Sequence, residues 1–309
     1  MDIGINYLDK EFDKVYGILI ENKFINTLKF PGKYCTLEEL ENCIDICKRY
    51  NIKIDIHGLP KMVSAVSSNS FIKDVQWEEI SKIIKRYNKV THISTHIGIE
   101  NGKKIENKEY AEKIFEKNMQ EMKTCFFKYL DDDIEFGVEN IPGGFKFDEE
   151  TLKPEYISNA WKTADFGVFD IAHAKLAGET LGVSYEDYRN NLLEKNKVKI
   201  LHVSGNCENC GKYLDKKDKH ILTCQSEIKD TIDAINEFKN LKLVVSEYAY
   251  NTRYSYEKEI MIEAILLWTM VNTKDEKKSS KVLEILKLEL NDDIGNWKEV
   301  INKVIDSVS

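Results

Sequence analysis

Short β-branched and apolar runs alternate along the chain with longer segments of helical periodicity. The eight runs expected to form strands are 3–6, 26–30, 52–57, 91–96, 134–139, 166–170, 198–203 and 241–247. The expected helices are 36–50, 77–87, 105–129, 150–162, 184–196, 226–239 and 255–271, with two more at 278–290 and 296–307. Strands that alternate with helices pair in parallel through right-handed crossovers. Eight of them favour closure into a (β/α)8 TIM barrel, with an open doubly wound sheet as the alternative.

No linker, low-complexity tract or charge block divides the chain. We therefore expect one domain, with a barrel core at about 1–272 and a C-terminal helical extension at about 278–307. Neither a G-x-G-x-x-G loop nor a P-loop follows any expected strand, which argues against dinucleotide and P-loop chemistry.

Composition narrows the class of protein further. The 309 residues include 45 Lys+Arg against 53 Asp+Glu, a net charge of −8, so nucleic acid remains a possible partner that the charge does not support. A hydrophobic content of 42% excludes global disorder. Because the chain has neither an apolar run of about 18 residues nor a signal-peptide pattern, we expect a cytoplasmic protein with no membrane partner. The seven cysteines are then expected to be reduced.

Side chains that can bind metal ions end six successive expected strands, the third to the eighth. They are His57, His96, Glu139, Asp170, His202 and Glu247. In a barrel these strand ends converge on the face that carries active sites. A single histidine or carboxylate at a strand end is more often a packed histidine or a helix cap. Six such residues in step with six strands favour a metal site instead.

Three further residues extend this set of donors. His173 follows Asp170 by three positions, and Asp218 and His220 form a D-x-H pair in a polar loop after the seventh strand. Nine nitrogen and oxygen donors exceed what one ion uses, so we predict two or three divalent ions (Zn, Mn or Fe) that share a bridging carboxylate. The remaining histidine, His92, is expected to be buried and hydrogen-bonded.

Several motifs resemble the xylose isomerase-like barrel superfamily, most closely the endonuclease IV type of apurinic endonucleases. The similar segments are THIG, GVEN, FDIAHAKLAG, LHVSGN, DKH and SEY, between about residues 52 and 250. The resemblance implies that Glu139 bridges two ions. It gives one of these ions His57 and His96, the other Asp170, His202 and Glu247, and a third ion His173, Asp218 and His220.

The resemblance leaves three functions open. A di- or trinuclear centre implies hydrolysis of a phosphate ester, such as a phosphodiester or abasic nucleic acid, with Glu139 and Glu247 as catalytic residues. Glu139, Asp170, His202 and Glu247 also resemble the single-ion site of sugar isomerases and epimerases, which implies a sugar or sugar-phosphate substrate. Weaker similarity links the chain to the methanobactin-type iron-dependent peptide oxidases, for which a partner protein is unknown.

Two other features suggest binding sites. Arg253, just past the eighth expected strand, and Lys175, on the turn after His173, are candidates for binding substrate, with solvent contact as the alternative for each. Cys207, Cys210, His220 and Cys224 have a spacing that could hold a structural zinc ion, against the alternative of reduced loop cysteines.

Overall fold

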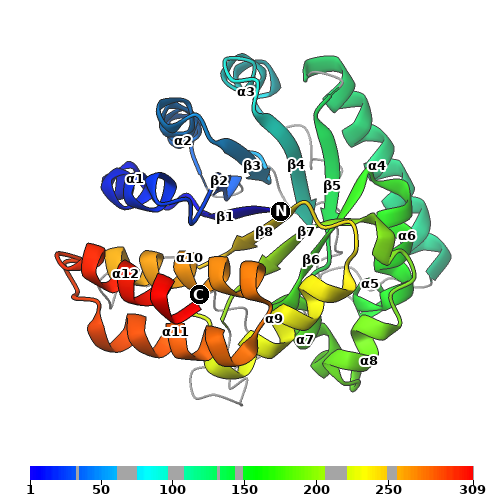
Figure 1. Ribbon diagram of the computed structural model, residues 1–309. Helices are drawn as coiled ribbons and strands as arrows, with labels where there is room; N and C mark the ends of the chain where they lie inside the picture. The colour runs from blue at the N-terminus through cyan, green and yellow to red at the C-terminus, as the bar shows by residue number, and fades with distance from the viewer. Residues whose placement is uncertain are drawn as a thin grey trace.

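The structure is a computed structural model in which eight strands form a central barrel surrounded by helices (Figure 1). It describes residues 1–32, 35–60, 75–96, 108–130, 133–142, 149–205, 221–248 and 256–308. The strands are β1 (Asp2–Asn6), β2 (Thr27–Phe30), β3 (Lys53–His57), β4 (Val90–His96), β5 (Glu135–Glu139), β6 (Phe166–Asp170), β7 (Val198–Val203) and β8 (Leu243–Ser246). Each strand pairs in parallel with the next, and β1 pairs with β8 to close the ring. The predicted (β/α)8 TIM barrel is confirmed, and its strands begin and end within two residues of the expected positions.

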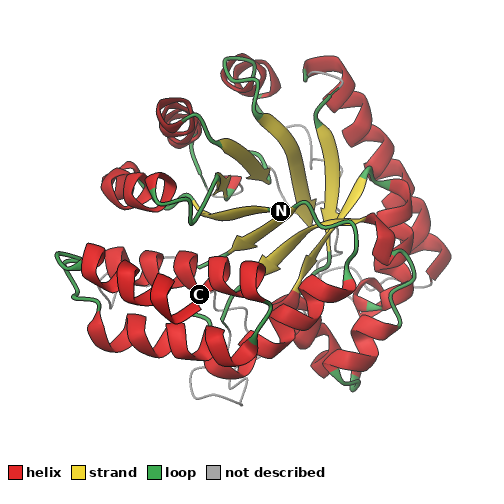
Figure 2. Cartoon of the chain, viewed as in Figure 1, coloured by secondary structure: helices red, strands yellow, loops and turns green. Residues whose placement is uncertain are grey.

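Helices cover the outside of this ring (Figure 2). Those of the barrel are α1 (Asp13–Glu21), α2 (Leu37–Tyr50), α3 (Trp77–Ile84), α4 (Lys108–Tyr129), α5 (Glu149–Leu152), α6 (Pro154–Thr163), α7 (Ile171–Leu181), α8 (Tyr185–Asn190), α9 (Gln225–Glu237) and α10 (Tyr256–Thr273). Short 3-10 helices occupy Lys10–Phe12 and Lys195–Lys197. The expected helix 150–162 is divided in two because Pro154 starts α6 at a position where its missing N–H costs nothing.

Helices α1 and α7 were not among the segments with helical periodicity. In each of them buried residues follow one another almost without a break, for example Val15 to Leu19 in α1 and Ile171 to Ala174 in α7. An amphipathic period depends on an exposed polar face, which such a helix lacks. The segment of α7 is therefore hard to recognise as a helix from its pattern alone.

The helices α11 (Glu276–Glu289) and α12 (Trp297–Val308) confirm the expected C-terminal extension. Helix α11 packs against α10 and α12 packs against α11, in the orange and red part of the ribbon (Figure 1). Val282, Leu283 and Leu286 of α11 and Val304 of α12 are buried in the main hydrophobic core. No helix in the described residues is both long and apolar enough to cross a lipid bilayer.

The inside of the barrel has an apolar side and a polar side. Phe166, Val168, Ile200, Leu243 and Val245 form a separate apolar cluster inside β6, β7 and β8. A Cβ atom at Gly137 would overlap the ring of Phe166, so the glycine of β5 makes room for this cluster. Buried polar residues occupy the inside of the other strands: Asn6, Thr27, Lys29, Asp55 and Ser94. On β6 and β7 the apolar cluster precedes Asp170 and His202, so buried polar groups occupy these two strands only near their carboxyl ends.

Candidate metal centre

Seven of the nine predicted ligands meet at the carboxyl ends of the strands. They are His57 from β3, His96 from β4, Glu139 from β5, Asp170 from β6, His173 from the first turn of α7, His202 from β7, and Glu247 just after β8. Their possible donor atoms form three overlapping groups, and within each group these atoms lie within 4.8 Å of one another. That these residues bind metal stays a prediction, but the structure brings all seven together.

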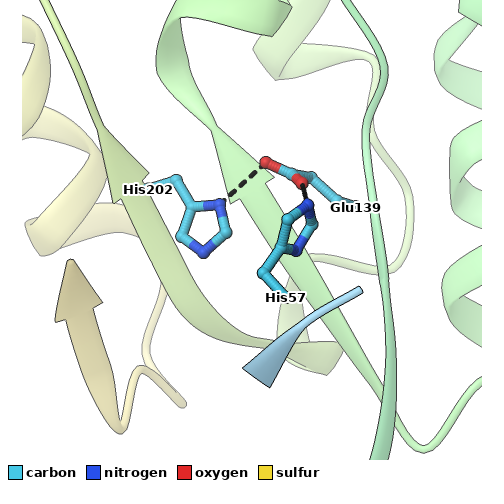
Figure 3. Close-up of side chains that lie close together, drawn as sticks. All are labelled: His57, Glu139 and His202. Atoms are coloured by element: carbon cyan, nitrogen blue, oxygen red, sulfur yellow. Dashed lines mark hydrogen bonds and ion pairs between the residues drawn. The ribbon is translucent and has the colours of Figure 1, made fainter. Parts of the chain in front are cut away.

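The carboxylate of Glu139 lies at the centre of this cluster and is fully buried (Figure 3). Its Oε2 atom is 3.0 Å from Nε2 of His57 and 2.8 Å from Nε2 of His96. Its Oε1 atom is 2.8 Å from Nδ1 of His202 and 3.6 Å from Nδ1 of His173. Glu139 is the residue that all three donor groups share.

Local hydrogen bonds fix the ends of β5 and β6 relative to each other. The side chain of Asn140 accepts from the backbone N–H of Asp170 at 2.7 Å and donates to its carbonyl at 2.9 Å. Asp170 also caps α7, because its Oδ1 atom accepts from the backbone N–H of His173 at 2.6 Å. Nδ1 of His173 lies 2.8 Å from the carbonyl oxygen of Asn140. These bonds hold the two carboxylates and His173 in fixed positions.

Residues from just after β8 and from β2 complete the cluster. The carboxylate of Glu247 lies 3.1 Å from Nδ1 of His202 through its Oε1 atom. The same oxygen forms an ion pair with the ammonium group of Lys29, a buried residue of β2. The sequence analysis did not identify Lys29 as part of this cluster.

Burial governs the protonation of the histidines. It lowers the pKa of His202 to about 3 and holds the pKa of His57 well below its usual range. Burial of Glu139 acts to raise its pKa, but the imidazoles of His57, His202 and His96 outweigh it and keep that pKa well below the usual range. Neutral imidazoles and an ionised carboxylate are the forms that bind metal ions.

The hydrogen bonds around the cluster also fit a bound cation. Metal-binding histidines usually give their other ring nitrogen to a carbonyl or a hydroxyl group. His173 does so with the carbonyl of Asn140, and Nδ1 of His57 lies 2.9 Å from the hydroxyl of Ser94. Nε2 of His202 is buried and forms no hydrogen bond with the described residues. A buried nitrogen without such a bond is costly, which a metal ligand explains.

The structure does not test several of the predicted residues. Asp218, His220, Arg253, Cys207 and Cys210 fall outside the described residues, so neither the expected zinc string nor the third ion is tested. Cys224 is buried just before α9, and its Sγ lies 3.0 Å from Oγ of Ser226. The ammonium group of Lys175 lies 2.6 Å from Asp230 of α9, and its role in binding substrate stays a prediction.

Three residues of the site escaped the sequence analysis: Lys29, Ser94 and Asn140. A pattern signal existed for Lys29, since it occupies a polar position between the buried apolar residues Leu28 and Phe30. Ser94 gives no such signal, because the next residue, Thr95, is polar as well. An inward lysine near the centre of a barrel needs a buried anion as its partner. Asn140 directly follows Glu139, but its role depends on the distance to β6, which no local pattern contains.

Comparisons with known proteins identify the fold. No protein-family model matches the chain, and no curated protein matches it. Among solved structures, SMc04130 from Sinorhizobium meliloti 1021 matches with a TM-score of 0.53 and 10% identity over 85% of this chain and 96% of that chain. A D-psicose 3-epimerase matches with a TM-score of 0.51 and 12% identity over 84% and 89%. AsfvAP matches with a TM-score of 0.51 and 9% identity over 85% and 96%.

Identities of 9 to 12% establish a shared fold and nothing finer. The closer resemblance to endonuclease IV and the weaker one to methanobactin-type oxidases stay predictions. The resemblance to the xylose isomerase-like superfamily likewise stays a prediction. The closed barrel and these structural matches together show that the chain has the (β/α)8 TIM-barrel fold.

Proposed function

We propose that this protein is a metal-dependent enzyme that hydrolyses a phosphate ester at a centre of at least two divalent ions. The observation that carries the proposal is the position of Glu139, which belongs to all three groups of possible ligands. A carboxylate that faces donors on both of its oxygens is suited to bridge two ions. If only one ion bound, several of these donors would have no metal ion to bind.

The residues divide into two sides around Glu139. His57 and His96 approach Oε2 at 3.0 and 2.8 Å, whereas His202 approaches Oε1 at 2.8 Å. Asp170 and Glu247 belong with His202 in the third donor group. We assign His57 and His96 to one ion and the Asp170, His202 and Glu247 set to the other, with Glu139 shared.

Divalent ions at these two positions would lower the pKa of a bound water and neutralise the negative charge of a phosphate ester. The protein then has to orient the ester and exclude competing water. The buried carboxylates and neutral imidazoles are held in place by Asn140, Ser94 and the helix-capping bond of Asp170, so little reorganisation is needed when a substrate binds.

A second function has its own support. Glu139, Asp170, His202 and Glu247 form a complete four-residue group, all of them buried. Such a set suffices for one ion in a sugar or sugar-phosphate isomerase, in which Glu139 and Glu247 would move the proton. No pattern among the described residues favours an iron-dependent oxidase over these two functions, so that alternative stays a sequence-based prediction.

The test combines metal content with turnover. The metal-free protein is loaded with Zn²⁺ or Mn²⁺, its ion content per chain is measured, and it is assayed on a simple phosphodiester, on abasic DNA and on a set of ketoses. We expect two or more ions per chain and phosphodiester turnover that Glu139→Ala abolishes. Glu135→Ala, which changes the same residue type at the other end of β5, is the matched control and should keep both.

Other outcomes decide against the proposal. One ion per chain with ketose turnover would establish the isomerase instead. Turnover of the ester that persists in the Glu139→Ala variant would show that the reaction does not use this centre.

A further inference from the structure

A lysine side chain lies inside the barrel, directly below the proposed metal centre. Lys29 of β2 is only 1% exposed. Its strand alternates, with Leu28 and Phe30 in the core outside the barrel and Thr27 and Lys29 on the other face. A buried ammonium group is costly unless anions lie next to it, so its surroundings must compensate its charge.

A buried carboxylate of the donor cluster provides this compensation. The ammonium of Lys29 forms an ion pair with Oε1 of Glu247, and this oxygen is also 3.1 Å from Nδ1 of His202. Lys29 is paired in register with Asp55 of β3, which is 1% exposed and lies two residues before His57. Lys29 therefore lies about two residues closer to the amino ends of the strands than the donor cluster, and it contacts one carboxylate of that cluster.

We propose that the ammonium of Lys29 is a built-in cation of the metal centre, which occupies Oε1 of Glu247 and so weakens the binding of a divalent ion beside it. This inference rests on the proposed function, because it assumes that the cluster binds a divalent ion. The positive charge of Lys29 opposes the entry of a further cation next to that carboxylate.

A built-in cation and a purely structural lysine predict opposite changes in metal affinity when Lys29 is removed. Removal of a structural lysine disturbs Glu247 and weakens metal binding. Removal of a built-in cation takes away a repulsive charge and leaves a buried carboxylate without its counter-charge, so a divalent ion binds more tightly. The direction of the change in affinity therefore separates the two roles.

The experiment measures Co²⁺ binding to the metal-free, full-length protein by visible absorption, together with the thermal unfolding midpoint of each variant. We expect Lys29→Met and Lys29→Gln to bind Co²⁺ about tenfold more tightly or better, with an altered absorption spectrum from the ion's changed ligand field. Lys29→Arg keeps the charge and should keep the affinity and spectrum of the natural protein. Lys199→Met, which removes a partly buried lysine that pairs with Glu135, is the matched control and should leave Co²⁺ binding unchanged.

A double variant tests the contact itself. In a Glu247→Gln background, Lys29→Met should no longer increase the affinity, because the carboxylate that it releases is gone. Equal or weaker Co²⁺ binding by a folded Lys29→Met or Lys29→Gln variant would overturn the inference. So would failure of both variants to fold, since Lys29 would then serve folding. If the natural protein binds no Co²⁺ at all, the proposed function fails instead.

Discussion

The same pair of residue types occupies both ends of the strand pair β4 and β5. His92 is paired in register with Glu135 at the amino end, and His96 with Glu139 at the carboxyl end. The two pairs are similar in geometry: Nε2 of the histidine lies 3.4 Å from Oε2 of Glu135 at one end and 2.8 Å from Oε2 of Glu139 at the other. What differs is the set of groups that surrounds each pair.

At the amino end the neighbours are cations. Lys199 forms an ion pair with Oε1 of Glu135, and Lys242 lies 3.8 Å from Oε2. Nδ1 of His92 lies 2.8 Å from the hydroxyl of Thr91, and its ring packs edge-on against Phe166. A hollow of about 320 Å³ opens there to solvent. Fixed ammonium groups thus compensate the carboxylate, which leaves little need for a bound ion.

At the carboxyl end the neighbours of the pair are themselves donors. Glu139 is surrounded by His57, His202 and His173, and Asp170 belongs to the same group of possible ligands. The ammonium of Lys29 also lies at this end, where it forms an ion pair with Glu247. The comparison shows that a His–Glu pair does not define a site by itself. Residues of the other strands decide whether lysines or further possible metal donors surround its carboxylate.

The largest difference between the two ends should be in metal affinity, when each glutamate of β5 is replaced in turn. Glu139→Gln keeps the side-chain size but removes the charge, so we expect Zn²⁺ or Mn²⁺ affinity to fall by about a hundredfold or more and turnover to be lost. Glu135→Gln should retain the metal content of the natural protein. Elemental analysis and a metal titration of both variants measure the contrast. Similar metal loss in the two variants would show that the two ends do not differ as described.

A second contrast uses pH and the amino-end histidine. Burial lowers the pKa of His92 to about 4 against the attraction of Glu135, with Lys199 and Lys242 adding to the decrease. Between this value and the ordinary 6.5, the unfolded chain binds a proton that the folded chain does not. Its contribution to stability is therefore complete above pH 6.5 and falls as the pH falls.

We expect this histidine to account for about 2 kcal/mol of the stability that the metal-free protein loses between pH 7 and pH 5. Urea unfolding of His92→Gln at both pH values should show a loss that is smaller by this amount. His57 and His202 are unchanged in the variant, so they cancel in the difference. An identical pH dependence in both proteins would mean that His92 titrates normally.

The smallest effect concerns the ion pairs of Glu135. The contacts with Lys199 and Lys242 are partly exposed, with 34% of the Glu135 side chain accessible, so solvent screens them. We expect Glu135→Gln to lower the free energy of unfolding by about 1 kcal/mol, and by less in 1 M salt. Urea unfolding at low and high salt checks this. A loss that grows with salt would contradict an electrostatic role for this carboxylate.

Much of the fold could be predicted from the chain because the strand signal is local. The runs that became β6 and β7 match the expected ranges residue for residue, and the six donors from His57 to Glu247 end up on the face where parallel strand ends converge. Helix α7 could not be recognised in this way, since burial on nearly all sides removes the amphipathic period on which such a prediction depends.

The sequence by itself determined the order of the strands and the residue types at their ends, because a strand is recognised from the pattern of its own few residues. Only the tertiary structure decided that Lys29 meets Glu247, that Asn140 joins β5 to β6, and that Glu135 meets lysines whereas Glu139 meets further donors. Electrostatic energy depends on distance through space and on burial. Neither quantity is fixed until the ring of strands has closed.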